Sequence, residues 1–189
     1  RVIKRFKPNP NCGSFVAIAR TNMASAALAL QHYPLAAESA REACESVGLP
    51  RDAHGLLNRV IGETVWLKSA IGLNDDETVE ARLKMIRDLS NAFKSPRLTL
   101  NRDLAEAAYE IYAGNLTVAV AKLLEMLKHS KKLPGIYRDN LVLLVKAYEN
   151  GQDHAGAILY LGELVEFLGK SQVAAVRSKL EVIRERVQT

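Results

Sequence analysis

The chain has 189 residues, 48% of them hydrophobic, which is enough for one domain with a sizeable core or for a short solenoid. Aromatic residues make up only 6% of it, which favours closely packed helices over a sandwich of aromatic and β-branched strands. No apolar run is long enough to span a membrane, and the N-terminal residues do not resemble a secretory signal, so we expect a soluble, cytoplasmic protein.

The net charge of +5 is concentrated at the two ends of the chain. Residues 1–7 contribute +4 and residues 170–189 contribute +3, which leaves −2 for residues 8–169. A protein that follows phosphates along a nucleic acid needs positioned cations on its folded surface. The charge distribution therefore disfavours nucleic-acid binding, which stays open only as an alternative.

The residues that carry catalytic or metal chemistry are few and scattered. Cys12 and Cys44 have neither metal-ligand spacing nor the density of a disulfide framework, so reduced thiols are expected. The four histidines each lie near a turn or a helix end, with no pair at i, i+4: His32, His54, His129 and His154. Asp153 precedes a helix, where an aspartate caps amide groups. We therefore predict no enzyme activity, no cofactor and no metal within these residues.

The predicted elements begin after a basic, proline-containing lead-in over residues 1–14. Apolar residues then recur at three and four positions, which is the helical period, starting at Phe15 with Ser14 as a candidate N-cap. Proline, glycine and asparagine residues mark the turns between the helical segments. The expected helices cover residues 15–30, 35–47, 53–71, 77–94, 101–113, 115–130, 137–149, 153–168 and 171–188.

The turns inside successive helix pairs recur at a regular interval. They fall near residues 34, 73, 114 and 151, so we interpret residues 15–170 as one repeat domain of about four antiparallel helix pairs. Residues 116–120 and 141–145 resemble strands when taken alone. Each of these runs continues into helical periodicity without a turn signal, which favours an all-α fold.

The fourth helix pair resembles a tetratricopeptide repeat in Leu141 to Leu144, Ala147-Tyr148, Gln152-Asp153 and Ala157-Ile158. Ala36, Ala40 and Ala43 of the first pair match in part, as do Ala108-Tyr109 and Ala119-Val120 of the third. The second pair matches poorly, and the repeat interval is longer than the usual 34 residues. The resemblance implies a right-handed α-α superhelix whose small residues allow close helix packing and whose tyrosines fill the gaps between units.

The same resemblance implies a concave surface lined by the first helix of each pair. The candidate partner-binding residues on that surface are Asn22, Glu63, Trp66, Asp103, Glu110, Lys146, Glu149 and Asn150. Acidic residues outnumber the single lysine, which disfavours a clamp for a terminal carboxylate and favours a basic or amphipathic helical partner. The alternative is that these acids are solvated side chains without a partner, and that Trp66 belongs to the core.

The last predicted helix, residues 171–188, carries apolar residues in a coiled-coil-like seam: Val173, Val176, Leu180, Ile183 and Val187. Its flanking charges are basic, which penalises pairing with its own copy. Three interpretations stay open: a cap on the fourth helix pair, a connector to a further domain, or a basic helix bound in the acidic groove.

Taken together, these patterns favour a protein–protein interaction or scaffold module. We expect it to be a regulatory segment of a larger polypeptide, because the chain opens with Arg1 and ends in a helical pattern at Thr189. These irregular helix pairs also resemble the regulatory segments of multidomain bacterial signalling proteins. Self-association is a further expectation. The alternatives are a nucleic-acid-binding repeat and a small-molecule sensor with its pocket near Trp66, Tyr109 and Tyr112.

Overall fold

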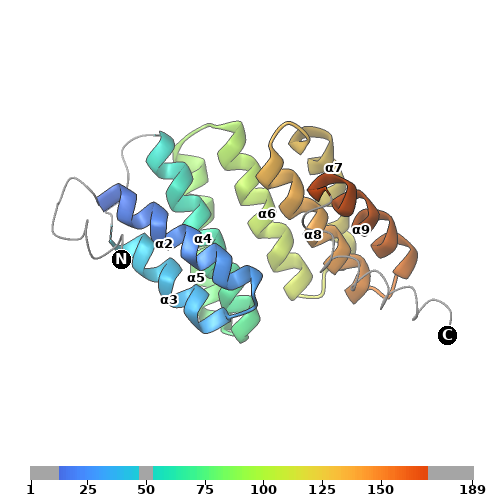
Figure 1. The fold of residues 1–189 in the computed structure, drawn as a ribbon, viewed down its shortest axis with the longest axis horizontal. Coiled ribbons are helices and arrows are strands. Elements are labelled where there is room, and N and C mark those ends of the chain that lie inside the picture. Colours follow the sequence, from blue (N-terminus) through green and yellow to red (C-terminus); the bar gives the residue numbers. More distant parts are fainter. Residues whose placement is uncertain (1–12, 47–52, 170–189) are drawn as a thin grey trace. The chain divides into compact units, whose positions relative to one another are not determined.

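The computed structural model describes residues 13–46 and 53–169, and all regular secondary structure in these two ranges is α-helical, with no strand (Figure 1). The helices are α2 (Gly13–Ala29), α3 (Tyr33–Glu45), α4 (Ala53–Leu73), α5 (Asp76–Ala92), α6 (Pro96–Tyr112), α7 (Leu116–Ser130), α8 (Pro134–Asn150) and α9 (His154–Leu168). The predicted all-α fold is confirmed. The predicted lead-in over residues 1–12 and the predicted helix 171–188 lie outside the described residues.

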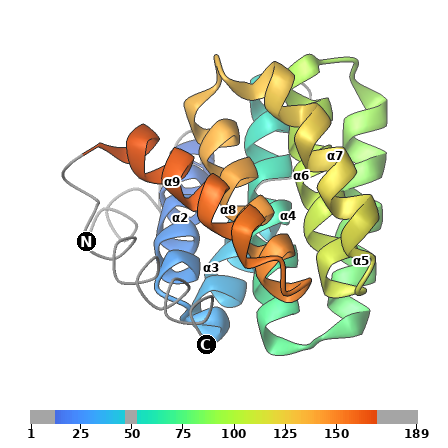
Figure 2. The ribbon, with the colours of Figure 1, turned by 90° about the vertical axis from the view of Figure 1, so that its right-hand side faces the viewer.

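The chain divides into two compact units, Arg1–Ala105 and Glu106–Thr189, and α6 contributes residues to both. In the first unit α2 packs on α3 and α4, α3 packs on α4, and α4 packs on α5. In the second unit α7 packs on α8 and α8 packs on α9; α8 and α9 can be followed in Figure 2. Within each unit, these sequence-adjacent helices are therefore also neighbours in space, as in helix-pair architectures.

Three prolines that were expected to interrupt helices lie instead in their first turns. Pro34 lies one residue into α3, while Pro96 and Pro134 are the first residues of α6 and α8. Proline is favoured at this position because its missing amide would have no acceptor inside the helix and its φ already suits the helix. The predicted starts at residues 35, 101 and 137 were consequently too late.

Four turns share one backbone geometry. Each contains a residue with positive φ: Gln31 (59°), Asn74 (55°), Gly114 (81°) and Gln152 (58°). At each turn the amide of the next residue donates to a carbonyl five positions earlier, as from Asp75 to Ala70 (3.0 Å) and from Asp153 to Tyr148 (2.9 Å). This is the Schellman arrangement that ends a helix in a left-handed residue. The same C-terminal capping motif therefore ends α2, α4, α6 and α8.

Each unit has its own apolar core. In the first unit, Ala24 of α2, Ala40 of α3 and Val65 of α4 pack together with Leu28 and Trp66 at their margin. The core of the second unit comes from α8 and α9 and consists of Tyr137, Leu141, Val145, Ala157, Leu161 and Leu164. Two of the three buried residues of the first core are alanines, the small residue type that the sequence pattern places in these helices. No helix within the described ranges is long and apolar enough to cross a membrane.

Candidate functional site

The candidate partner-binding residues of the first unit occupy unequal environments. Asn22 is exposed on α2, and Trp66 is half-buried on α4. Asp103 is half-buried and accepts hydrogen bonds from Nε (3.1 Å) and Nη2 (2.8 Å) of the adjacent Arg102. Glu63 has 0% exposed surface. A side chain without exposed surface does not contact a partner, so we remove Glu63 from the candidate binding residues.

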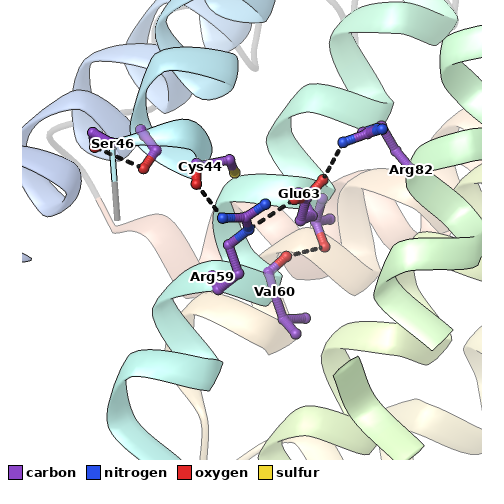
Figure 3. Close-up of polar contacts among 8 residues, drawn as sticks. Cys44, Ser46, Arg59, Val60, Glu63 and Arg82 are labelled. Carbon is purple, nitrogen blue, oxygen red and sulfur yellow. Dashed lines mark hydrogen bonds and ion pairs between the residues drawn. The ribbon is translucent and has the colours of Figure 1, made fainter. Parts of the chain in front are cut away.

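Glu63 is the centre of a buried charge cluster that joins α4 to α5 (Figure 3). Its Oε1 accepts from Nε of Arg59 at 2.8 Å, one turn earlier on the same helix, and its Oε2 accepts from Nη1 of Arg82 at 3.3 Å. The Arg59 guanidinium also donates to the carbonyl of Cys44, at the end of α3. The two cations compensate the carboxylate, and the cluster connects three consecutive helices.

Trp66 belongs to the edge of this cluster. The Arg82 guanidinium carbon lies 4.2 Å from the centre of the Trp66 ring, a cation–π geometry. Arg82 therefore contacts both Glu63 and Trp66 and brings together two of the candidate residues. Their contact is internal to the fold, which supports the alternative that Trp66 is a core residue.

Cys44 lies against the same cluster and is almost fully buried. Burial, followed by the negative charge of Glu63, raises the pKa of its thiol to about 12. A thiol that stays protonated at neutral pH is a poor nucleophile and a poor metal ligand. The arrangement fits the predicted reduced, unreactive cysteine.

The candidate residues of the second unit lie at or near the ends of α6 and α8. Glu110 is half-buried and accepts from the side-chain amide of Asn115 at 2.8 Å. Lys146 and Asn150 are exposed on α8, whereas Glu149 is half-buried there. The carboxylates of Asp103 and Glu110 thus have partners inside their own units, which weakens the electrostatic case for a basic ligand.

Metal-ligating side chains are not clustered in the part of the chain that the structure describes. No group of three or more His, Cys, Asp or Glu side chains converges there. Asp153 caps α9 by accepting from the amide of Gly156 at 3.0 Å, which confirms the predicted capping role. Asp75 caps α5 in the same way through Thr78, at 3.1 Å.

A further surface of the first unit is the outer face of α2. Phe15 is 69% exposed, Met23 42% and Leu30 70%. Ala26 and the candidate residue Asn22 are exposed between them. Leu30 directly follows the last residue of α2, and its amide still donates to the Ala26 carbonyl at 3.1 Å. At 100° per residue these five side chains fall within one arc of about 100°. The signal was present in the sequence: the apolar residues of α2 are too many for one buried stripe, so some had to remain outside.

Comparison of the chain with protein-family models, with curated proteins and with solved structures finds no match to any of them.

Proposed function

We propose that this chain is a protein–protein interaction module built on tetratricopeptide-like helix pairs, and that it associates with a second copy of itself through the outer face of α2. We define that face by Phe15, Asn22, Met23, Ala26 and Leu30. The observation that carries the proposal is the exposure of its three large apolar side chains. The four equivalent Schellman turns support the repeat assignment.

Exposing these three large apolar side chains to water costs free energy unless another apolar surface covers them. A helix that is apolar on nearly all sides is normally a buried helix. The fully buried apolar residues of α2 are Val16, Ala24 and Ala27, with Leu28 packed partly against the core, and the three fully buried residues are smaller than those that α2 leaves in water. Contiguous exposed apolar patches typically mark interaction sites. The outer face of α2 therefore favours an apolar partner surface.

The charge of the face favours a second copy over a charged partner. None of its five residues is ionisable, and the neighbouring Arg20 is turned toward α3, where its Nη2 lies 3.0 Å from Oε2 of Glu42. Two-fold pairing of identical faces therefore brings no like charges together. Asn22 at the middle of the face can hydrogen-bond to its equivalent across the axis.

The size of the face predicts a weak complex. A helix of 17 residues is about 25 Å long, and one helix–helix contact of that length buries less than the roughly 800 Å² per partner of a standard interface. We expect a dissociation constant in the micromolar range or above. A reversible dimer of this kind suits a scaffold or regulatory module.

The test is sedimentation equilibrium from about 5 to 500 μM, a range chosen to bracket that affinity. Wild-type protein is expected to dimerise reversibly, and Met23→Glu or Ala26→Glu to weaken dimerisation at least tenfold, because each places like charges across the two-fold axis. Val118→Glu, which changes an exposed apolar residue on α7, is the matched control and is expected to leave the dimer unchanged. Circular dichroism establishes that each variant is folded.

A wild-type chain that stays monomeric over this range contradicts the proposal. A dimer that is insensitive to both α2 variants, or that is weakened equally by Val118→Glu, places the interface elsewhere and contradicts it as well.

A further inference from the structure

The last described helix, α9, leaves an apolar stripe uncovered on the side that faces away from α8. Leu159 is 64% exposed at the centre of this stripe, and Ala155, one turn earlier, is exposed as well. Gly162 lies on the next turn, with nothing within 4 Å of a Cβ added there. At 100° per residue these three positions fall within an arc of about 60°, opposite the core residues of α9. We call this stripe the outer face of α9.

The composition of α9 is unusual for a helix that is covered on one side only. Of its 15 residues, only His154, Glu163 and Glu166 are ionisable near neutral pH. Phe167 is a second large apolar side chain with exposed surface, at 37%. Surface helices normally confine their apolar residues to the stripe that faces the core. The outer face of α9 is therefore suited to contact with another helix, and the small residues beside Leu159 allow that helix to come close.

The backbone at the end of α9 permits an immediate reversal of the chain. Gly169 has a φ of 68° and a ψ of −177°, a combination that is essentially restricted to glycine. The helix predicted over residues 171–188 begins two residues later. Connections this short join helices that pack as antiparallel neighbours. Because α8 already covers the inner side of α9, the outer face is the side that is open to the next helix.

The predicted helix matches the outer face of α9 in length and in register. Its 18 residues correspond to about 27 Å, against about 22 Å for the 15 residues of α9. Its apolar seam runs from Val173 to Val187, with Leu180 at the centre. In an antiparallel pair with its turn at residues 169 and 170, Leu180 falls opposite Leu159, because the two leucines are equally far from the turn. The centre of one apolar surface thus meets the centre of the other.

The charges of the two surfaces are opposite in sign. α9 has no lysine or arginine, and its exposed Glu166 and half-buried Glu163 lie within about 40° of Leu159 around the helix. Residues 170–189 carry a net charge of +3, and the residues that flank the predicted seam are basic: Arg177, Lys179 and Arg184. A second copy of α9 would bring glutamates together, so the charges favour residues 171–188 over self-pairing of this face.

We infer that the outer face of α9 is a docking site for an amphipathic basic helix, and that residues 171–188 of the same chain occupy it. The segment packs antiparallel to α9, with Leu180 against Leu159 and with Arg177 beside the carboxylates of Glu163 and Glu166. This contact does not depend on the outer face of α2. A helix of another protein with the same spacing and charge has to displace residues 171–188 before it binds, so the segment regulates access to the second unit.

The experiment is amide hydrogen exchange of the full chain, followed by mass spectrometry at about 0.5 μM, below the expected dissociation constant of the α2 dimer. Amides of residues 175–187 are expected to exchange slowly, because they are hydrogen-bonded in a packed helix. Leu159→Glu and Leu180→Glu each place a charge in the apolar contact and are expected to speed that exchange roughly tenfold or more. Glu166→Gln removes an opposite charge and is expected to speed it roughly two- to fivefold.

Two matched controls lie on α7 of the same unit. Val118→Glu changes an exposed apolar residue, as Leu159→Glu does, and Glu125→Gln removes an exposed carboxylate, as Glu166→Gln does. Neither control is expected to alter exchange in residues 175–187. Unchanged exchange in α8 shows that each variant remains folded.

Fast exchange of residues 175–187 in the wild-type chain overturns the inference. Slow exchange that is insensitive to Leu159→Glu places the segment on another surface, and slow exchange that requires a higher protein concentration makes a second copy the occupant, so both results overturn it. An equal loss of protection in Val118→Glu overturns it too.

Discussion

The ring of Tyr148 lies against Gly156, so a Cβ added at Gly156 would come within 2.6 Å of the tyrosine Cδ1. The Tyr148 ring also stacks on Tyr160, with ring centres 5.6 Å apart and an angle of 8° between the planes. The tyrosine is thus held between α8 and α9. In the first unit, Gly72 and Tyr33 have the same relationship, at 2.4 Å.

Gly156→Ala is therefore expected to destabilise the protein by about 1–3 kcal/mol, because the tyrosine has to leave its packed position. Gly162 is the matched control, since it lies on the same helix with nothing within 4 Å of its added Cβ. Gly162→Ala is expected to stabilise by roughly 0.5–1 kcal/mol through helix propensity. Urea denaturation measures both, and a Gly156→Ala variant as stable as Gly162→Ala contradicts the packing argument.

Glu63→Gln tests the buried charge cluster. The substitution keeps the side-chain shape but leaves the Arg59 and Arg82 guanidinium groups without their buried counter-charge. Breaking a buried ion pair by removing one partner costs about 3–5 kcal/mol. Glu125 is the control: it also lies beside two basic side chains, Lys128 and His129, but at an exposed site, so Glu125→Gln is expected to leave the denaturation midpoint unchanged. If Glu63→Gln and Glu125→Gln lowered the denaturation midpoint equally, burial of the carboxylate would not matter for its contribution to stability.

The raised pKa of Cys44 predicts a specific dependence of stability on pH. The thiol pKa is about 12 in the folded chain against an ordinary value of 9.0. Below about pH 9 both states keep the thiol proton; above it the unfolded chain loses the proton first, so the free energy of unfolding falls as pH rises toward the folded pKa.

Wild-type protein and Cys44→Ala should therefore approach each other in stability between pH 8.5 and 10.5, with a slope of up to about 1.4 kcal/mol per pH unit. All other titrating groups, including Cys12, are common to both proteins and cancel. Denaturation curves at several pH values measure the difference. A difference that stays constant over this range would mean that the thiol ionises as readily in the folded chain as in the unfolded one.

Asp153→Ala is expected to lower stability by about 1 kcal/mol, because the amide of Gly156 loses its side-chain acceptor at the start of α9. Asp153→Asn, which retains a capping oxygen, is expected to be nearly neutral. Thermal or urea denaturation distinguishes the two variants. If Asp153→Asn lowers stability as much as Asp153→Ala does, the charge of Asp153 matters more than its capping hydrogen bond.

Local rules explain where the sequence analysis succeeded. The three-and-four spacing of apolar residues predicted all eight described helices, and Asp153 was predicted as a cap because an N-cap bond involves only neighbouring residues. The same rules permitted a helix to begin at Pro96 or Pro134, but an X-Pro pair is equally a stop signal, so those boundaries were misplaced.

Only the tertiary structure decided which polar residues are internal. Arg59 lies one turn before Glu63 and was visible as a partner, but Arg82 is 19 positions away on the next helix, so the full burial of Glu63 was not predictable from spacing. The unpaired hydroxyl of Ser90 and the exposure of Phe15 and Leu30 were not predictable from spacing either. Helix period depends on the chain's own local geometry, whereas burial depends on which other helices pack around each face, and that information lies far along the sequence.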